Sequence, residues 1–592
     1  MSPTRTDRLR RRQILSGASV ALAATAGCLQ QIRNLAGRER SSPLSLSIKT
    51  LPTDADPYAI RIARTLADAL ETVGVETQLH PMAREELYRQ LLVTHDFDLY
   101  VAPLLGQTDP DFLRPLLHSQ FVGERGNQNP FGYVDLATDD LLDAQRRASR
   151  RDRQSPVVDL QEAVAQAQPF TVLAYPDDVI AGRTDRFSGW SEHPPTTAIA
   201  YLAATRERPD ADVLTAALRD PRPTRNLNPI AAEYRGRGTV TDLLYDSLAR
   251  EHGEAVSPWL ATRWEWVDGT DGGLRATVHL REATWHDGRA LTAADVAFTY
   301  RFLRDTSLGE ADAPVPAERF RGRGSLVTDA SVVDDRTVEL AFGDTARGVA
   351  RRALTVPILP RHVWRSRTGA ATVAGVSVSE ETTRALVWSN TNPIGSGPLR
   401  LHALEEDRRV VLTPVRDHFS GSLDGEIGEV VGDGPAFDRL VFEVVPSDAV
   451  AVQAVREGQV DVTATPLGAP VVSELEAAVA DDPIEMVVDP SPVFYHVGYN
   501  VRRAPLSNPR FRRAVARLLD KRHVVESVFD GYAMPATSPL ATTDWLSSAL
   551  AWDGTDPVLP YFGSDGELDV ERARAAFVEA GYRFRDGALH QR

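Results

Sequence analysis

The chain has 592 residues, 42% of them hydrophobic, which is enough for roughly two to four domains with buried cores and excludes a disordered protein. Its formal net charge of −16 argues against nucleic acid as a partner, because phosphate binding requires a cationic surface. Cys28 is the only cysteine, which excludes an internal disulfide and any metal site built from several cysteines.

The basic residues are almost all arginine. Lys49 and Lys521 are the only lysines among 66 basic residues, and these face 82 acidic residues. An acidic excess with so few lysines predicts a halophilic archaeon with a GC-rich genome, in which a densely charged acidic surface keeps proteins soluble. An ordinary acidic extracytoplasmic protein is the alternative.

Residues 1–28 predict an export signal. A basic segment, Arg8 to Arg12, precedes an apolar segment, Ile14 to Gly27, that is too short to span a bilayer stably. Arg11 and Arg12, or Arg10 and Arg11, resemble the twin-arginine export motif, and a generic basic segment of an export signal is the alternative.

The four residues "TAGC" at the end of this segment resemble a lipobox. Cys28 would receive the lipid, and Thr25 stands where leucine is usual. A lipid on Cys28 would anchor the protein to the outer face of the cell membrane. The polar residues 29–43 would then form a tether.

Strands and helices alternate after the tether. Alternating apolar residues predict a half-exposed strand at Leu44 to Thr50, and helical periodicity predicts a helix that starts at Pro57 and is capped by Gly74. A second strand, a second helix and a more buried third strand are expected at residues 75–81, 84–92 and 97–105. This alternation predicts an α/β layer around a central sheet.

The middle of the chain has a different character. Residues 259–287 are rich in Trp, Thr, Val and turn residues and predict a small mixed sheet. A helix capped by Thr292 and a hairpin that turns at residues 334–336 are expected next. From Phe437 the alternation of strands and helices returns, and no second apolar run is long enough to span a membrane.

The end of the chain looks incomplete. A helix is expected at Val570 to Ala580, with Gly581 as its cap and a turn at Asp586 and Gly587 that should introduce a strand. The chain then stops after five more residues. We therefore expect residues 43–51, near the front of the chain, to supply the missing strand.

Several blocks resemble one known family in their order along the chain. They lie at residues 225–230, 240–250, 258–269, 276–305, 392–401, 437–462 and 495–540. Together they resemble the family 5 extracellular solute-binding proteins, the dipeptide, oligopeptide and nickel receptors of ABC importers. The resemblance implies an α/β, two-lobed, periplasmic-binding-protein-like fold of type II with an extra small α+β subdomain.

The elements that should follow these blocks stand at the front of this chain. Residues 43–51, 56–81, 97–120 and 129–148 resemble them in order, and residues 170–190 resemble the end of such receptors. Each part occurs once, so we infer a circular permutation whose old ends are joined near residues 190–212. Two fused half-genes, or an error in the reading frame, are the alternatives.

The permutation implies a division of the chain. Residues 44–175 and 481–592 would form the second lobe, and residues 176–480 the first lobe, with the extra subdomain at about 253–385. The two lobes would close around a solute.

The resemblance also points to candidate binding residues. In the related peptide receptors an Asp meets the amino group of the peptide three residues before a "DPD" loop, and this chain has Gly106 there, with Pro103 at the usual aromatic position. The expected amine clamp is therefore missing. Asp109 to Asp111 could equally be a turn and helix cap, and Asn500 could equally fix backbone. The candidate ligand-binding residues are Gly106, Gln107, Thr108, Asp109, Tyr499 and Asn500.

An enzyme is not expected, because His286 and Asp287 lack a nucleophile in context and no histidine pair has zinc-binding spacing. No cofactor or metal is expected either. The predicted function is a monomeric, membrane-anchored receptor that delivers a peptide-like or other small polar solute to an ABC permease and its ATPase. The alternatives are a solute-sensing or scaffolding receptor not coupled to transport and, less favoured, a secreted hydrolase.

Overall fold

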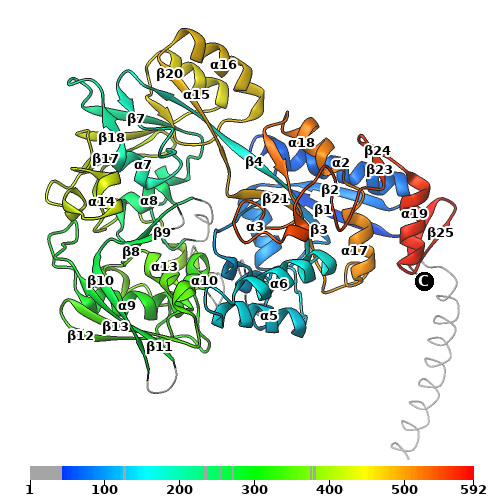
Figure 1. Ribbon diagram of the computed structural model, residues 1–592, viewed down its shortest axis with the longest axis horizontal. Coiled ribbons are helices and arrows are strands. Elements are labelled where there is room, and N and C mark those ends of the chain that lie inside the picture. Colours follow the sequence, from blue (N-terminus) through cyan, green and yellow to red (C-terminus); the bar gives the residue numbers. More distant parts are fainter. Residues whose placement is uncertain are drawn as a thin grey trace, which may run out of the picture.

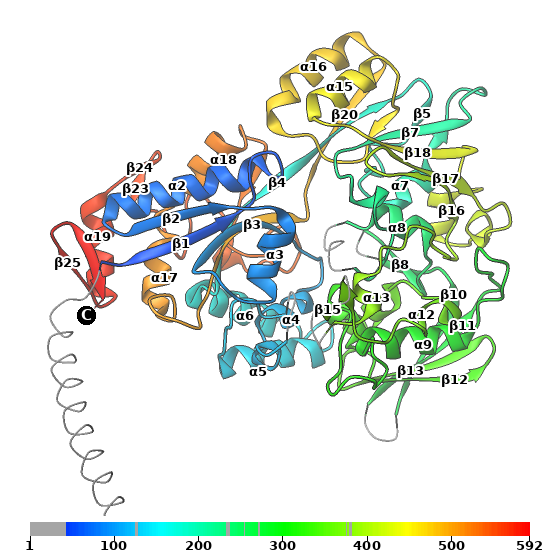
Figure 2. The same cartoon turned by 180° about the vertical axis from the view of Figure 1, so that it is seen from behind.

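The computed structural model describes residues 43–124, 128–231, 237–253, 255–269, 273–373, 376–377 and 382–591. Two α/β lobes lie side by side and are joined by long strands (Figure 1, and from behind in Figure 2). The predicted α/β class and the two lobes are confirmed. The predicted export signal with Arg11 and Arg12, the lipobox with Cys28 and residues 29–42 of the tether lie outside the described residues.

One mixed sheet runs through both lobes. Among the described residues it has 12 strands in the order β16-β17-β18-β7-β19-β4-β21-β3-β1-β2, with β20 and β22 also paired to β4. β4 (Phe170–Arg183) belongs to both lobes, because its first half pairs with β21 (Val493–Tyr499) and its second half with β20 (Ile484–Pro490). This strand fixes the lobes relative to each other, as its backbone hydrogen bonds continue from one lobe to the other.

The second lobe is built on the β21 end of the sheet. β1 (Ser45–Thr50) pairs in parallel with β2 (Glu76–Pro81) and β3 (Leu99–Leu105), and β3 pairs with β21 in antiparallel fashion. β1 and β21, from opposite ends of the chain, therefore belong to one sheet. The helices of this lobe are α2 (Pro57–Val73), α3 (Arg84–Leu92), α4 (Leu113–Leu117), α5 (Leu136–Arg147), α6 (Gln154–Ala167), α17 (Pro509–Ala516), α18 (Lys521–Val528) and α19 (Val570–Glu579).

Helix α2 shows why the local sequence was sufficient to predict its start and its end. The Asp56 side chain accepts hydrogen bonds from the backbone N–H groups of Tyr58 and Ala59, and Pro57 occupies the first turn, where an N–H is not needed. Gly74, with φ 97°, ends the helix in the left-handed conformation that favours glycine. The predicted bounds of α2 and α3 are confirmed.

The chain ends in a hairpin that corrects the expectation of a missing strand. β25 (Tyr582–Arg585) and β26 (Ala588–Gln591) pair around a turn at Asp586 and Gly587, whose φ values are 51° and 83°. The strand after the turn is therefore formed by the last residues themselves, because a two-residue turn with positive φ suffices to reverse the chain.

Residues 43 and 44 instead lie beside β26, where Pro43 and His590 form an antiparallel bridge. The Leu44 N–H donates to the Leu589 carbonyl over 2.8 Å, and the Leu589 N–H donates to the Gly74 carbonyl over 2.7 Å. The start of the described chain and its end thus lie side by side, as Figure 1 also shows. A Cβ at Gly74 would lie 2.2 Å from the Gly587 carbonyl oxygen, so α2 packs directly on the hairpin turn.

The first lobe is built on the other end of the sheet. Its strands are β7 (Val213–Leu218), β16 (Leu399–Glu405), β17 (Arg409–Pro414), β18 (Arg439–Val444) and β19 (Val462–Thr463). Its helices include α7 (Ala198–Ala203), α8 (Thr239–Leu244), α14 (Glu426–Val431), α15 (Asp448–Arg456) and α16 (Val472–Asp481). β18 pairs in parallel with β7, and β17 in antiparallel fashion with β18, so the sheet is mixed here too.

A subdomain extends from the first lobe. Its sheet has the order β10 (Ala261–Asp268), β11 (Leu274–Leu280), β13 (Thr337–Gly343) and β12 (Asp329–Asp334), packed with α9 (Ala293–Arg304). All its pairings are antiparallel, so the expectation of a mixed sheet was wrong; hairpin connections make antiparallel pairing the local outcome. Thr292 and Asp295 form a capping box at α9, which confirms the predicted cap.

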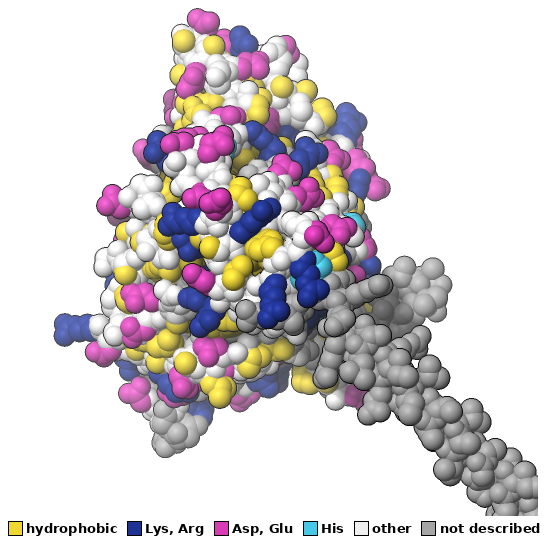
Figure 3. Space-filling model, turned by 90° about the vertical axis from the view of Figure 1, so that its right-hand side faces the viewer, with side chains coloured by type: hydrophobic (Ala, Val, Ile, Leu, Met, Phe, Trp, Pro, Cys, Tyr) yellow, Lys and Arg dark blue, Asp and Glu magenta, His cyan; other side chains and the backbone are white. Residues whose placement is uncertain are grey.

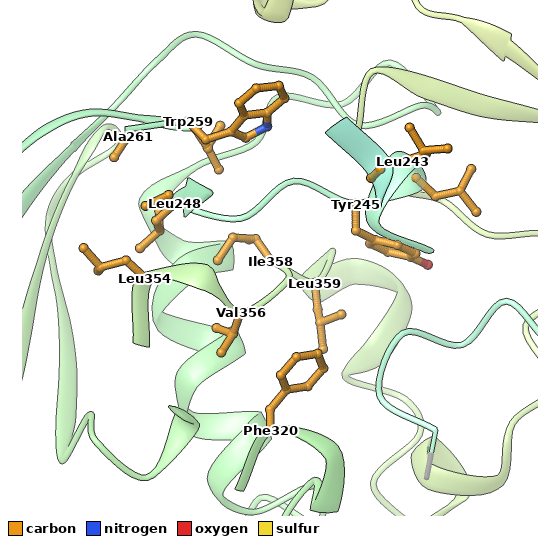
Figure 4. Close-up of a cluster of buried hydrophobic side chains, with 14 of the residues drawn as sticks. Leu243, Tyr245, Leu248, Trp259, Ala261, Phe320, Leu354, Val356, Ile358 and Leu359 are labelled. Carbon is orange, nitrogen blue, oxygen red and sulfur yellow. The ribbon is translucent and has the colours of Figure 1, made fainter. Parts of the chain in front are cut away.

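A buried hydrophobic cluster joins the subdomain to the first lobe. Figure 4 shows Tyr245 and Leu243 of the α8 region facing side chains from residues 354–359 and Phe320. Trp259 is fully buried in the same cluster and its indole N–H donates to Asp246 over 2.7 Å. The cluster supports the loops that form one wall of the cavity described below.

Charges of both signs cover the end of the second lobe. Figure 3 shows Arg side chains interspersed with Asp and Glu over this face. The two lysines are both buried: Lys521 forms an ion pair with Asp556 at 2.7 Å, and Lys49 contacts the backbone at Asp96. Within the described ranges, no helix combines the length and the apolar composition needed to cross a bilayer.

We predict that Leu589→Ala destabilises the second lobe by about 3 kcal/mol, because Leu589 is fully buried against the core of this lobe and its loss leaves a cavity. Urea unfolding measures the change. Val578→Ala, in the neighbouring helix α19 but 46% exposed, should change the free energy of unfolding by less than about 0.5 kcal/mol. Equal effects of the two variants would contradict the placement of β26 in the core.

Candidate functional site

A cavity of about 840 Å³ lies between the two lobes. One wall comes from the second lobe, mainly from α3, β3 and residues 112–116. The other comes from the first lobe and its subdomain, mainly from residues 192–199, α8, β8 (Ala249–His252) and residues 318–323. A cavity of this size between two lobes is the kind of space in which proteins hold small solutes.

The second-lobe wall is largely apolar. Arg84 is the one charged residue among the described residues of this wall. His496 of β21 lies at its floor, where its Nε2 shares a hydrogen bond of 2.9 Å with the Tyr100 hydroxyl. The apolar and aromatic members are Tyr88, Leu91, Leu92, Tyr100, Ala102, Pro103, Leu104, Leu105, Phe112, Pro115, Leu116 and Val493.

His496 is neutral over the physiological range. It is 1% exposed and packs against Tyr100, Phe131, Phe170 and Phe494. Burial disfavours the imidazolium and lowers its pKa to about 3. The floor of the cavity therefore carries no positive charge from this residue.

The first-lobe wall is rich in charge. Its arginines are Arg222, Arg237, Arg250, Arg319, Arg321, Arg323 and Arg352, and its acidic residues are Glu192, Asp242, Glu251 and Glu318. The Asp242 side chain is exposed to the cavity. The surrounding protein atoms disfavour its ionised form and so raise its pKa, and the positive charges of Arg319, Arg250 and Arg323 offset part of this rise.

Ion pairs connect the two lobes beside the cavity. Arg352, from the 3-10 segment Arg351–Thr355 of the first lobe, is 5% exposed and lies 3.4 Å from Asp109 and 3.6 Å from Asp111 of the second lobe. Arg321 of α10 (Arg321–Gly324) forms a bidentate pair with Glu124, at 2.8 and 2.6 Å. The lobes are therefore held in a closed arrangement by contacts that an opening movement would break.

Asp109 is the centre of this interlobe contact. Arg153 of its own lobe donates to both its carboxylate oxygens over 2.7 Å, and Arg352 approaches from the other lobe. Burial alone would raise the pKa of Asp109, but Arg352 and Arg153 lower it to about 2. The Asp109 side chain also accepts a hydrogen bond from the Asp111 N–H and so caps the 3-10 turn Pro110–Phe112. This agrees with the alternative that Asp109 to Asp111 form a turn and helix cap.

The other candidate residues of this loop have distinct positions. Gln107 lines the cavity, and its side-chain oxygen accepts a hydrogen bond from Arg352. The Gly106 N–H donates to the Pro492 carbonyl over 2.8 Å, and a Cβ there would lie 3.0 Å from that oxygen. Thr108 is exposed and is not among the residues that line the cavity.

Tyr499 and Asn500 lie in the core of the second lobe and not at the cavity. Tyr499 is fully buried and its hydroxyl shares a hydrogen bond of 2.7 Å with Thr171. The Asn500 amide donates to the backbone carbonyls of His95 and Phe97 over 3.0 and 2.9 Å. The side chains at the end of this buried strand thus stabilise the fold. For Asn500 this is the alternative given above, that the residue fixes backbone.

The first-lobe wall contains residues that sequence reasoning missed. Asp242 and Arg250 fall inside a block that carried the family resemblance, but nothing in that block marks which side chains face the cavity. In the part of the chain that the structure describes, no group of three His, Cys, Asp or Glu could hold a metal ion. What the arrangement offers is enclosure, an apolar surface and charged hydrogen-bond donors.

Comparison with known proteins agrees with the sequence resemblance. The sequence pattern of the family described as "Bacterial extracellular solute-binding proteins, family 5 Middle" matches residues 255–590. The dipeptide-binding protein of Escherichia coli is 26% identical over 344 residues, 55% of each chain. The oligopeptide-binding protein AppA of Bacillus subtilis is 23% identical over 354 residues, 59% of this chain and 56% of AppA. The chain spans about half the length of the curated relatives it matches.

Among solved structures, NikZ from Campylobacter jejuni in complex with Ni(L-His) is similar, with 18% sequence identity and a TM-score of 0.45. The match covers 64% of this chain and 65% of NikZ.

We predict that the Asp109→Asn variant loses less stability than the unchanged protein when the pH is lowered. Because the pKa of Asp109 is lowered from 3.8 to about 2, its ionised form stabilises the folded protein above pH 4, and this stabilisation is lost as the pH falls from about 4 to about 2. Over this window, the free energy of unfolding of the unchanged protein should fall by roughly 2 kcal/mol more than that of the variant. Chemical denaturation at several pH values in this window measures it.

Asp140→Asn, at an exposed position of α5, is the matched control. Its acid dependence should equal that of the unchanged protein. If Asp109→Asn also behaves like the unchanged protein, Asp109 is not the coupled ion-pair centre described above.

Proposed function

The chain belongs to the family 5 extracellular solute-binding proteins, and from that premise we propose that it is an extracytoplasmic receptor for a peptide-like or other small polar solute. It would deliver the solute to the permease and ATPase subunits of an ABC importer. The single observation that carries the proposal is the 840 Å³ cavity whose two walls belong to different lobes.

The interlobe ion pairs support a mechanism of reversible closure. Arg352 with Asp109 and Arg321 with Glu124 form only when the lobes are together, while β4 and the β20–β21 connection keep the lobes attached. A solute that contacts both walls adds binding free energy to the closed state alone, and therefore shifts the population toward it. No covalent chemistry is needed for this function.

The N-terminal sequence supports attachment to the membrane. We propose that residues 1–28 direct export, through Arg11 and Arg12, and that Cys28 carries a lipid that holds the receptor at the outer face of the cell membrane. The described chain begins next to its own last strand, so this tether would leave from the end of the second lobe. We propose that the receptor acts as a monomer in a halophilic archaeon, on the strength of its acidic, lysine-poor composition.

We also propose that the chain is a circular permutation of the family order, with residues 44–175 and 481–592 as the second lobe and residues 176–480 as the first. Two observations support this. Residues 43 and 44 bond to residues 589 and 590, so a short linker could join them. β4 also changes partner from β22 and β21 to β20 near Pro176.

A thermal-shift screen tests the proposed function. Dipeptides, oligopeptides, sugars and nickel chelates are added to the purified protein, and a solute that binds only the folded state raises the melting temperature. We expect at least one class to raise it and to reduce the radius of gyration in X-ray scattering. If no class changes either quantity, the proposal fails.

A cavity-filling variant provides the control. Thr197→Trp, on the first-lobe wall, should abolish the solute-dependent rise in melting temperature, because the indole occupies the space of the solute. Thr72→Trp, at an exposed position of α2 away from the cavity, should leave it unchanged.

A rearranged chain tests the proposed permutation. Residue 591 is joined to residue 43 by a Gly-Ser linker, and new ends are opened between the exposed residues Pro209 and Asp210. Because no hydrogen bond of the sheet is lost, we expect a melting temperature within about 5 °C of the original chain and retained solute binding. A rearranged chain that does not fold would contradict the proposal.

A further inference from the structure

The two walls of the cavity differ in charge in a way that bears on the solute. The second-lobe wall is largely apolar, and among its described residues Arg84 is the one charged side chain. The first-lobe wall holds seven arginines against four acidic residues, in a chain whose net charge is −16. The cavity is therefore cationic on one side and apolar on the other, whereas the chain as a whole is strongly acidic.

Some of these arginines are engaged by carboxylates that do not line the cavity. Arg321 is paired with Glu124, Arg352 with Asp109 and Asp111, and Arg222 with Asp220. These pairs hold loops and lobes together, so their charge is largely compensated.

Arg237 lines the cavity and keeps one hydrogen-bond donor without a partner. Its Nη2 forms an ion pair with Asp178 and lies 3.2 Å from the Ser491 hydroxyl, but its Nη1 is buried and has no hydrogen-bond partner. A buried, unpartnered donor of a guanidinium is costly unless a ligand satisfies it. An anionic oxygen is the acceptor that a guanidinium binds most strongly.

Arg323 and Arg250 add positive charge beside it on the same wall. Arg323 donates to the Thr355 hydroxyl over 2.8 Å, and the nearest carboxylate, that of Glu251, is 3.9 Å away. Arg250 lies over the Trp259 ring at 4.1 Å and donates to the backbone carbonyl of Asp242. Neither guanidinium is in a close pair with a carboxylate, so both add to the attraction for an anion.

Among its described residues, the cavity favours an anion over an amine, because its four acidic side chains are outnumbered by arginines. Gly106 stands where the resemblance implied an amine-binding Asp, and Asp242 lies among Arg319, Arg250 and Arg323, whose charges repel a cation. An ammonium group placed at Asp242 would meet three guanidinium groups at once. A solute with a free amino group would thus lose more than it gains here.

Gln128 places one further requirement on the chemistry of the solute. It is 1% exposed and lines the cavity; its amide nitrogen donates to the Glu318 carbonyl, but its Oε1 is buried and has no hydrogen-bond partner. An N–H group of the solute would satisfy this oxygen.

Resting on the proposed solute-binding function, we propose that the solute is an amphipathic anion without a free amino group. Its acidic head lies against Arg237, Arg250 and Arg323 of the first lobe, its apolar body lies along the second-lobe wall, and an amide N–H meets Gln128. An acidic peptide or amino acid that is blocked at its amino end has this chemistry.

Calorimetric titration with matched probes tests the inference. N-acetyl-Phe-Asp should bind about tenfold more tightly than Phe-Asp, because it lacks the ammonium group, and Phe-Arg should bind more weakly than either. N-acetyl-phosphotyrosine distinguishes a phosphate head from a carboxylate head, and tight binding of either blocked anion supports the inference.

The outcomes separate this inference from the proposed function. If Phe-Asp or Phe-Arg binds as tightly as the blocked anions, the receptor function stands and the inference is overturned. If neither these probes nor any class in the thermal-shift screen binds, the receptor function itself fails.

Charge variants locate the acidic head. Arg237→Gln and Arg323→Gln should each weaken binding of N-acetyl-Phe-Asp by about tenfold, and Asp242→Asn should strengthen it severalfold, because it removes a negative charge near the head. Arg365→Gln, at an exposed position outside the cavity, is the control and should change nothing. Melting temperatures without solute show whether each variant is folded.

The opposite pattern would refute the assignment. Unchanged affinity in both arginine variants, or weaker binding in Asp242→Asn, would mean that no acidic head lies against this wall.

Discussion

The hydrogen bonding of β4 is the constraint on which the rest of the structure depends. This 14-residue strand pairs with β21 and β22 in the second lobe and with β20 and β19 in the first, so one unbroken backbone belongs to two cores. The lobes can therefore change their angle but not separate. The cavity lies between the two lobes that this strand joins, and residues of both lobes line it.

Charge adds a second constraint, because burying an ion is unfavourable unless a partner meets it. Asp109 and Asp111 satisfy this in the second lobe with Arg153 and Arg146, and Arg352 joins them only when the lobes approach. In the proposed open state, Arg352 regains water and the two carboxylates keep their own partners. The proposed closure is thus a moderate change in free energy, which a solute that contacts both walls shifts toward the closed state.

Much of the fold follows from local sequence, whereas the site does not. α2 was predicted because its apolar periodicity, Pro57 at its start and Gly74 at its end are signals in the local sequence. Tyr499 was assigned to the site because the family resemblance places the end of its strand near the lobe interface, but core packing decides where its ring lies. Arg237 carried no local signal, because all but two of the 66 basic residues are arginine and only the folded chain brings it into the lining of the same cavity as Gln128 and α3.

The central claim is that the lobes close around a solute, and the distance between the lobes tests it most directly. Spin labels at Val134 of the second lobe and Val333 of the subdomain, both exposed, report this distance by double electron–electron resonance. The account predicts a broad distribution without solute and one narrow, shorter distance with saturating solute. An unchanged distribution at a solute concentration that saturates calorimetric binding would contradict it.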